Sequence, residues 1–236
     1  MSRKKFKRPA HLQIQALLSK LNKAFLDEAK CYFGGGTRIV LELGEYRESR
    51  DIDFMCSDRE GYRLLRESVS ETSLGHIQTP AVSLARDVRA DQYGIRTFLN
   101  NNGDKLKLEI FHEARIDIEG AQISSIPVMC LTRRLCFAEK FLANTDRGLD
   151  ASTLSRDIID LAFMIEGWSN DDATVGLAMA QAAYGTSVLR ALAAVTEKMR
   201  SDKTYRHRCI DGLAISEPKV LTAGVKTLTE FRVQSG

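Results

Sequence analysis

The chain has 236 residues, a formal net charge of +3 at pH 7, 44% hydrophobic residues and 28% charged residues. These values are typical of a globular protein and suit one large domain or two small ones. No apolar run reaches about 18 residues, which excludes a membrane-spanning helix, so no membrane partner is expected. The small positive charge permits a nucleic-acid partner but does not require one.

The cysteines and the N-terminal stretch bear on the location of the protein. Five cysteines occur, an odd number without the spacing of a zinc site: Cys31, Cys56, Cys130, Cys136 and Cys209. Reduced thiols and a cytoplasmic location are therefore expected. The basic stretch 2–8 is followed by Pro9 and an amphipathic pattern, not by the apolar segment of a signal peptide. We interpret it as a solvated tail, with a weak contact to an RNA backbone as the alternative.

The first half of the chain alternates between helical and strand patterns. Apolar residues recur at helical spacing after Pro9, and a short strand then leads into a glycine triplet. Period-two alternation indicates the later strands, two of which are joined by a hairpin turn at 101–104. The expected helices are 9–30, 37–43 (ended by Gly44) and 58–69 (capped by Asp58). The expected strands are 31–33, 51–56, 81–85, 93–99, 105–111 and 122–128.

After Pro127 the pattern becomes helical. The expected helices are 132–144, 153–168, 171–184, 187–198 and 216–233, with 200–208 as an irregular segment or a surface helix. The sequence therefore predicts an α+β fold, in which a mixed sheet with flanking helices is followed by a helical bundle. We predict a first domain over residues 1–130 and a helical domain over residues 131–236.

An Asp-x-Asp pair lies in the expected strand 51–56. Asp51 and Asp53 are two residues apart on a strand, so they share one face and leave the backbone about 6.6 Å apart. Such a pair can hold two Mg²⁺ ions about 3.5–4 Å apart. Mg²⁺ prefers a few carboxylates together with phosphate and water oxygens. A solvated strand face is the alternative reading of the pair.

A third carboxylate is expected from the alternating strand 105–111. Glu109 falls on its polar face, and an adjacent strand is only about 4.8 Å away. Glu109 is therefore a candidate ligand of the second metal, or a base acting on an attacking hydroxyl.

The glycine triplet is a candidate phosphate loop. Gly35 and Gly36 carry no side chain where a triphosphate must approach backbone N–H groups, and the helix beginning near Thr37 directs its positive end to the same place. Arg47 and Ser49 precede the acidic pair and are candidates to contact phosphates or to orient the loop.

Two helical segments of the second half carry further candidates. Lys140 and Arg147 share one face of a helix, where Lys140 can reach a triphosphate as a point charge or remain a solvated lysine. Asp160 lies in a segment that is apolar nearly all round, so it is expected to be buried and to need a partner, for which Arg156 is the nearest candidate. Asp160 and Arg156 have two alternative roles: a structural ion pair or a direct contact to the substrate.

Together these positions resemble the AbiEii-type nucleotidyltransferases, which are toxins of abortive-infection and toxin–antitoxin systems within the polymerase-beta-like superfamily. The resemblance covers about residues 30–167. It rests on three motifs in the first half: Gly35-Gly36-Thr37, Arg47-x-Ser49-x-Asp51-Ile52-Asp53-Phe54, and Lys107-Leu108-Glu109-Ile110. In the second half, Ala138-Glu139-Lys140, Asp146-Arg147 and Arg156-Asp157-x-x-Asp160-Leu161 are similar to the family's two helical motifs.

The resemblance implies a nucleotidyltransferase-type fold, Mg²⁺, an NTP donor and transfer of a nucleoside monophosphate to an acceptor. For toxin members it implies an RNA acceptor such as tRNA and a cognate antitoxin. It also implies that Lys140 binds the triphosphate and that Asp160 and Arg156 shape the nucleotide or acceptor side. Two rivals remain: transfer to a small molecule, as in antibiotic adenylyltransferases, and a nucleotide-binding fold without turnover.

Overall fold

The computed structural model describes residues 6–101 and 103–235. The chain divides into two compact units: the first comprises Met1–Glu42 and Ser49–Thr132, and the second comprises Leu43–Glu48 and Arg133–Gly236. The assignment of a catalytic domain to 1–130 and a helical domain to 131–236 stays a prediction. The short segment 43–48 interrupts the first unit in sequence but belongs to the second unit, which the sequence patterns did not indicate.

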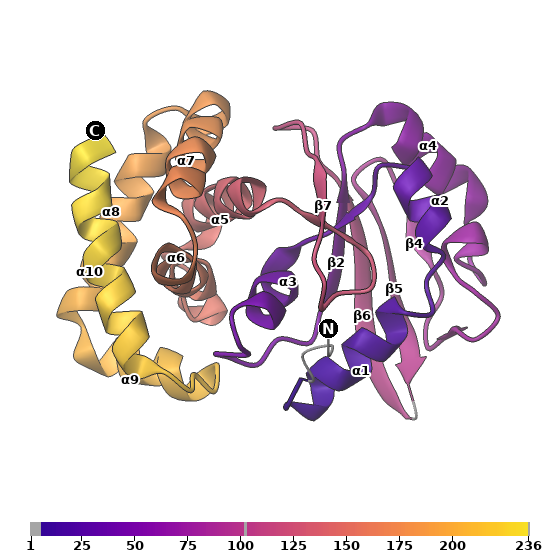
Figure 1. The fold of residues 1–236 in the computed structure, drawn as a ribbon, viewed down its shortest axis with the longest axis horizontal. Helices are drawn as coiled ribbons and strands as arrows, with labels where there is room; N and C mark the ends of the chain where they lie inside the picture. The colour runs from indigo at the N-terminus through magenta and orange to yellow at the C-terminus, as the bar shows by residue number, and fades with distance from the viewer. Residues whose placement is uncertain (1–5, 102, 236) are drawn as a thin grey trace. The chain divides into compact units, whose positions relative to one another are not determined.

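The first unit contains a mixed sheet, visible in Figure 1. The strands are β1 Tyr32–Phe33, β2 Ile52–Cys56, β3 Ser83–Leu84, β4 Arg89–Ala90, β5 Gly94–Asn101, β6 Asp104–His112, β7 Gly120–Gln122 and β8 Met129–Leu131. Their order is β3-β5-β6-β2-β1-β8-β7, and β4 pairs with β5. β2 is antiparallel to β1 and parallel to β6. β2 is therefore an interior strand with a neighbour on each side.

The helices of the first unit are α1 Pro9–Leu18, α2 Lys23–Glu28, α3 Gly35–Glu42, α4 Arg59–Ser68 and the 3₁₀ turn η1 Gly75–Ile77. α3 follows β1 directly and contacts β2. The core is formed by the apolar face of the sheet and by α1, with Phe33, Phe54, Leu108 and Ile110 buried in one cluster. Burial of alternate residues in β2 and β6 follows the period-two pattern that predicted these strands.

The prediction of one helix over 9–30 is wrong, because the chain breaks between α1 and α2. Leu21 forms a β-bridge to Gln78 in the interruption. The Asn22 side chain then accepts a hydrogen bond from the Phe25 N–H at 3.3 Å and caps α2. Apolar spacing persists through the break since both helices bury residues in the same core, so periodicity alone does not reveal it.

The prediction of a strand over 122–128 is also wrong. β7 ends at Gln122, the first residue of this stretch, and β8 begins at Met129, directly after it. The intervening residues form a turn in which the Ile126 N–H donates to the Ile123 carbonyl oxygen at 3.0 Å. Pro127 has no N–H to donate to a strand ladder, and Ser124 and Ser125 form the turn, so this stretch does not pair as a strand.

The hairpin joining β5 and β6 is confirmed by the pairing of Asn101 with Asp104. Gly103 has φ +95, the left-handed conformation that glycine adopts without steric cost. Asn102, which the hairpin prediction also named, lies outside the described residues.

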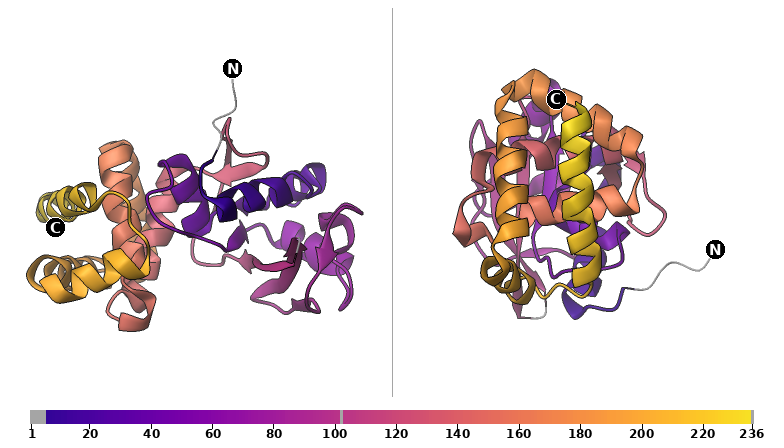
Figure 2. Two further views of the ribbon diagram at one scale, coloured as in Figure 1. Left: turned by 90° about the horizontal axis from the view of Figure 1, so that it is seen from below. Right: turned by 90° about the vertical axis from the view of Figure 1, so that its left-hand side faces the viewer.

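The second unit is helical (Figures 1 and 2). Its helices are α5 Arg133–Arg147, η2 Ala151–Thr153, α6 Arg156–Gly167, α7 Asn170–Tyr184, α8 Ser187–Ser201, α9 Lys203–Gly212 and α10 Pro218–Ser235. α5 packs against α6, α7 and α8, and α10 packs against α6 and α8. The predicted α+β class, a mixed sheet with helices followed by a helical region, is confirmed. Over residues 6–101 and 103–235, no helix is long and apolar enough to cross a membrane.

Candidate active site

The acidic pair lies at the start of β2. Asp51 directly precedes the strand and Asp53 lies within it, and both are partly buried. Ile52 and Phe54 alternate with them and are fully buried in the core. The two carboxylates therefore share the face of the sheet opposite the core, as the strand periodicity predicts.

Glu109 of β6 is the register partner of Asp53. Its carboxylate is 13% exposed and forms ion pairs with Lys107 Nζ at 2.5 Å and with Arg96 Nε at 3.5 Å. Among the described residues, no group of three or more His, Cys, Asp or Glu side chains is arranged to hold a metal ion. The donor set that fits Mg²⁺ here is the Asp51–Asp53 pair, since Mg²⁺ commonly takes one or two carboxylates and completes its shell with phosphate and water oxygens.

The glycine loop packs against the same carboxylate. The Gly34 N–H donates to the Asp53 carbonyl oxygen at 2.8 Å. Gly35 has φ +66, and a Cβ on it would collide with the carboxylate of Asp53. α3 begins at Gly35, two residues earlier than predicted, so the loop glycines form the first helical turn. The first N–H groups of a helix have no intrahelical partners and attract anions, so this turn can approach a phosphate next to Asp53.

We expect Gly35→Ala to damage the site in a way that an ordinary loop glycine does not. A positive φ costs an alanine about 1–3 kcal/mol, and the new methyl group would displace the Asp53 carboxylate. Gly103→Ala is the matched control, because Gly103 also has a positive φ but no atom lies within 4 Å of a Cβ built there. Thermal unfolding and nucleotidyl transfer should show similar melting temperatures for the two variants but a loss of activity in Gly35→Ala alone. Equal activities would contradict a role for this close approach.

Thr37 and Ser49 are held together rather than exposed to solvent. Their hydroxyl oxygens are 2.7 Å apart, and Thr37 is fully buried. The Ser49 N–H donates to Nε2 of His11, which is buried in α1, at 3.4 Å. These contacts connect α3, the segment before β2, and α1.

The remaining predicted residues lie in the second unit, where Asp160 is the centre of a buried cluster. Arg47 donates to both Asp160 oxygens, from Nε at 2.7 Å and Nη2 at 2.8 Å. The Tyr46 hydroxyl donates to Asp160 Oδ1 at 2.6 Å, and the Tyr46 ring stacks on Phe163 at 3.8 Å. Lys140 Nζ lies 2.6 Å from Asp160 Oδ2. The segment 43–48 is thereby fixed to α6 of its own unit.

Asp157 extends this cluster by one helical turn. It accepts from Lys140 Nζ at 2.8 Å and from Arg147 Nε at 2.8 Å. Lys140 is only 6% exposed, whereas the Arg147 side chain is 40% exposed. The cluster holds three cations and two carboxylates. Burial opposes ionisation of both aspartates, but Arg47 and Lys140 hold the pKa of Asp160 below its ordinary value, and Lys140 and Arg147 do the same for Asp157.

These pKa shifts predict a loss of stability in acid. A carboxylate whose folded pKa is depressed stabilises the fold above its unfolded pKa of about 3.9, and this contribution is lost as the pH falls through the folded pKa. We expect the urea midpoint of the helical unit to fall between pH 5 and pH 2. An Asp157→Asn variant should show a smaller fall over the same range. The same acid dependence in both proteins would contradict the assignment.

The expectation that Arg156 is the partner of Asp160 is wrong. Arg47, 113 residues away along the chain, takes that position together with Lys140. Arg156 is the first residue of α6, where the helix dipole disfavours a cation, and a cation placed N-terminal to an acid at i,i+4 is the weaker orientation.

Sequence reasoning missed several residues that contact the predicted ones. His11, Tyr46 and Arg96 were not named at all, and Lys107 and Asp157 were named only as members of motifs, without a role. Asp157 lies three residues before Asp160, so helical spacing could have grouped them. Arg96 and Lys107 lie on the polar face of strands that were correctly identified, and period-two alternation could have placed Lys107 beside Glu109.

Two solved structures from Helicobacter pylori have a similar fold. One is a candidate nucleotidyltransferase, with a TM-score of 0.56 and 14% identity over 96% of this chain and 94% of that chain. The other is JHP933, with a TM-score of 0.56 and 13% identity over 98% of this chain and 95% of that chain. Identities this low show a common fold alone. A search of curated proteins finds no match.

The sequence comparison gives the class of protein and then its family. Residues 16–218 match the family described as "Nucleotidyl transferase AbiEii toxin, Type IV TA system", so the protein is a nucleotidyltransferase. The chain belongs to this AbiEii family, whose members are toxins of type IV toxin–antitoxin systems. The resemblance read from the motifs is thereby confirmed.

Proposed function

We propose that the protein transfers a nucleoside monophosphate from a Mg²⁺-bound NTP to an RNA acceptor such as tRNA. The observation that carries this proposal is the close packing of Gly35 against the Asp53 carboxylate, which brings a helix N-terminus next to a candidate metal ligand. In the reaction the acceptor hydroxyl attacks the α-phosphorus, a new P–O bond forms, and pyrophosphate leaves.

Asp51 and Asp53 are proposed to hold Mg²⁺, one ion or two. The metal would neutralise the charge of the phosphates and of the leaving pyrophosphate. Glu109, the neighbour of Asp53 in the sheet, either ligates the second ion or accepts the proton of the attacking hydroxyl. The ion pairs to Lys107 and Arg96 fix its carboxylate in position for either role.

Each unit carries candidate groups for binding the donor. In the first unit, the N–H groups at Gly35, Gly36 and Thr37 would bind phosphate oxygens, with Ser49 orienting the loop through Thr37. In the second unit, Arg147 is the most accessible cation of the buried cluster and is proposed to contact the triphosphate. The buried members Arg47, Lys140 and Asp160 would hold Arg147 and α6 in position through the ion pairs of the cluster. Arg156, at the start of α6, is a candidate contact on the acceptor side.

Membership of a toxin family supports the RNA acceptor and a cognate antitoxin protein as partner. The alternative acceptor is a small hydroxylated molecule, and the further alternative is nucleotide binding without turnover. Salt distinguishes the acceptors because phosphate contacts release counterions, so an RNA Michaelis constant should rise steeply with salt while that of a small acceptor should not.

The test is a pyrophosphate-release assay with Mg²⁺ and each of the four NTPs, in the presence of total tRNA or a panel of hydroxylated small molecules. Salt-sensitive release that requires RNA and one NTP would support the proposal. Release with a small acceptor alone would replace RNA with that acceptor. NTP binding without pyrophosphate release under every condition would support nucleotide binding without turnover instead.

A further inference from the structure

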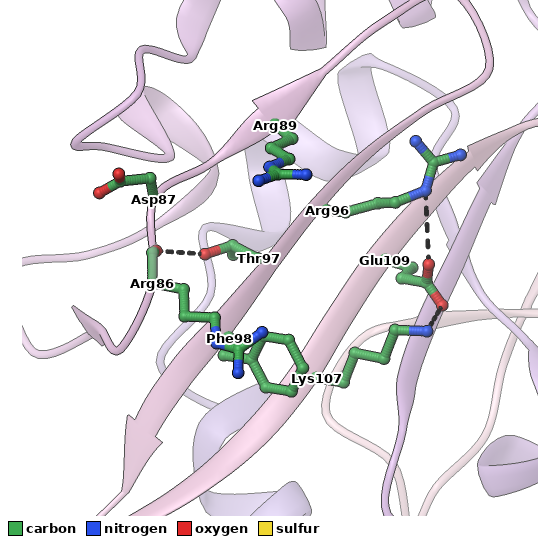
Figure 3. A pocket seen from close by; sticks show the side chains of 8 residues that line it. All are labelled: Arg86, Asp87, Arg89, Arg96, Thr97, Phe98, Lys107 and Glu109. Carbon is green, nitrogen blue, oxygen red and sulfur yellow. Dashed lines mark hydrogen bonds and ion pairs between the residues drawn. The ribbon is translucent and has the colours of Figure 1, made fainter.

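A basic pocket of about 590 Å³ lies beside Glu109 in the first unit (Figure 3). Four cations line it, Arg86, Arg89, Arg96 and Lys107, against two carboxylates, Asp87 and Glu109. Glu109 and its two ion-pair partners belong to the proposed active site, whereas Arg86 and Arg89 have no role in it.

Strand register connects the pocket to the candidate metal site. Asp53 of β2 is paired with Glu109 of β6, Glu109 with Arg96 of β5, and Arg96 with Arg89 of β4. These four residues form one row across adjacent strands. At about 4.8 Å per strand, the Arg89 backbone lies about 14 Å from that of Asp53.

The cations of the pocket are not equivalent. Glu109 lies between Arg96 and Lys107 and pairs with both, as the dashed lines in Figure 3 show. Arg86 and Arg89 are exposed, and within the described part of the chain neither forms an ion pair with a carboxylate. Arg86 lies over the Phe98 ring, with Cζ 4.6 Å from the ring centroid, which orders its guanidinium.

Arg96 lies opposite Arg89 and is already ion-paired, with Asp91 Oδ2 at 3.1 Å from its Nη1 and with Glu109. Arg89 is therefore the cation of this register pair that remains available to a ligand. Guanidinium groups such as those of Arg86 and Arg89 bind phosphate oxygens in a bidentate manner.

We infer that this pocket binds the phosphate backbone of the RNA acceptor strand, through Arg86 and Arg89 with Arg96 at its inner edge. The inference rests on the proposed function. In an in-line displacement the nucleophile and the leaving group lie on opposite sides of the reacting phosphorus. β2 has β1 and the glycine loop on one side and β6, β5 and β4 on the other. With the leaving phosphates at the glycine loop, the acceptor enters from the side of the pocket.

The test compares Arg86→Glu/Arg89→Glu with the control Lys23→Glu/Arg190→Glu. Lys23 and Arg190 are exposed and outside the pocket lining, and both double variants change the net charge by the same amount. Binding of a fluorescein-labelled single-stranded RNA is measured over a salt series without NTP, next to melting temperature and NTP affinity. We expect the pocket variant to bind RNA at least tenfold more weakly and its salt slope to fall by about 1.4, the value for two lost single-strand phosphate contacts. The control should match the wild type, and NTP affinity should be unchanged in both.

Equal RNA affinity and salt slope in the two double variants would overturn the inference. Label transfer from an NTP to RNA by the wild-type protein separates this outcome from failure of the proposed function. RNA binding is measured without NTP. If the wild-type protein transfers no label to RNA, the proposed function is contradicted, while the binding measurement still tests the role of the pocket.

Discussion

Asp53→Asn should reduce nucleotidyl transfer by about a thousandfold or more, because the metal supplies several kilocalories per mole of charge stabilisation and each 1.36 kcal/mol corresponds to about tenfold in rate. Asparagine retains the shape of aspartate and Asp53 is only partly buried, so the melting temperature should change by no more than a few degrees. Gly34 bonds to the backbone carbonyl of Asp53, which the substitution retains.

The matched control is Asp117→Asn, which removes an exposed carboxylate of the same unit. It should leave both the rate and the melting temperature unchanged. Full transfer by a folded Asp53→Asn protein would remove Asp53 from the chemistry.

Asp160→Ala should destabilise the helical unit by about 3–5 kcal/mol, because it leaves buried cations without their counter-ion. Arg47 would lose two hydrogen bonds, Tyr46 one, and Lys140 one of its two carboxylates. The urea midpoint, followed by the helical circular dichroism signal, measures this effect. Asp211→Ala, on the exposed side of α9, is the control and should change the midpoint little.

The same variant separates a structural role from a substrate role for Asp160. A large loss of stability with an NTP affinity near that of the wild type, measured below the unfolding transition, would identify Asp160 as a structural residue of the helical unit. An unchanged midpoint together with a lost NTP affinity would contradict the structural account of the cluster.

Local patterns predicted much of the first unit. The alternation in 51–56 and 105–111 identified β2 and β6, and placed Asp53 and Glu109 on the polar face where the register pairs them. The turn residues around Gly103 identified the hairpin, because the conformational preferences of turn residues act within a few residues of the chain.

These local patterns did not predict contacts between residues that are distant in sequence. Arg47 is two residues from Ser49, yet the two lie in different units, and the partner of Arg47 is Asp160. Period and propensity describe neighbours along the chain, whereas a buried charge is compensated by whichever cation the tertiary fold brings to it. The break after α1 was missed for a related reason, because a distant β-bridge to Gln78 interrupts a continuous apolar pattern.

Transfer of label from α-labelled NTPs to total tRNA, with Mg²⁺ and with wild-type protein beside Asp53→Asn, tests the central claim most directly. The account predicts label on RNA from one NTP with the wild type, and loss of that label with the variant. Equal labelling by the two folded proteins would contradict the assignment of the chemistry to the Asp51–Asp53 pair.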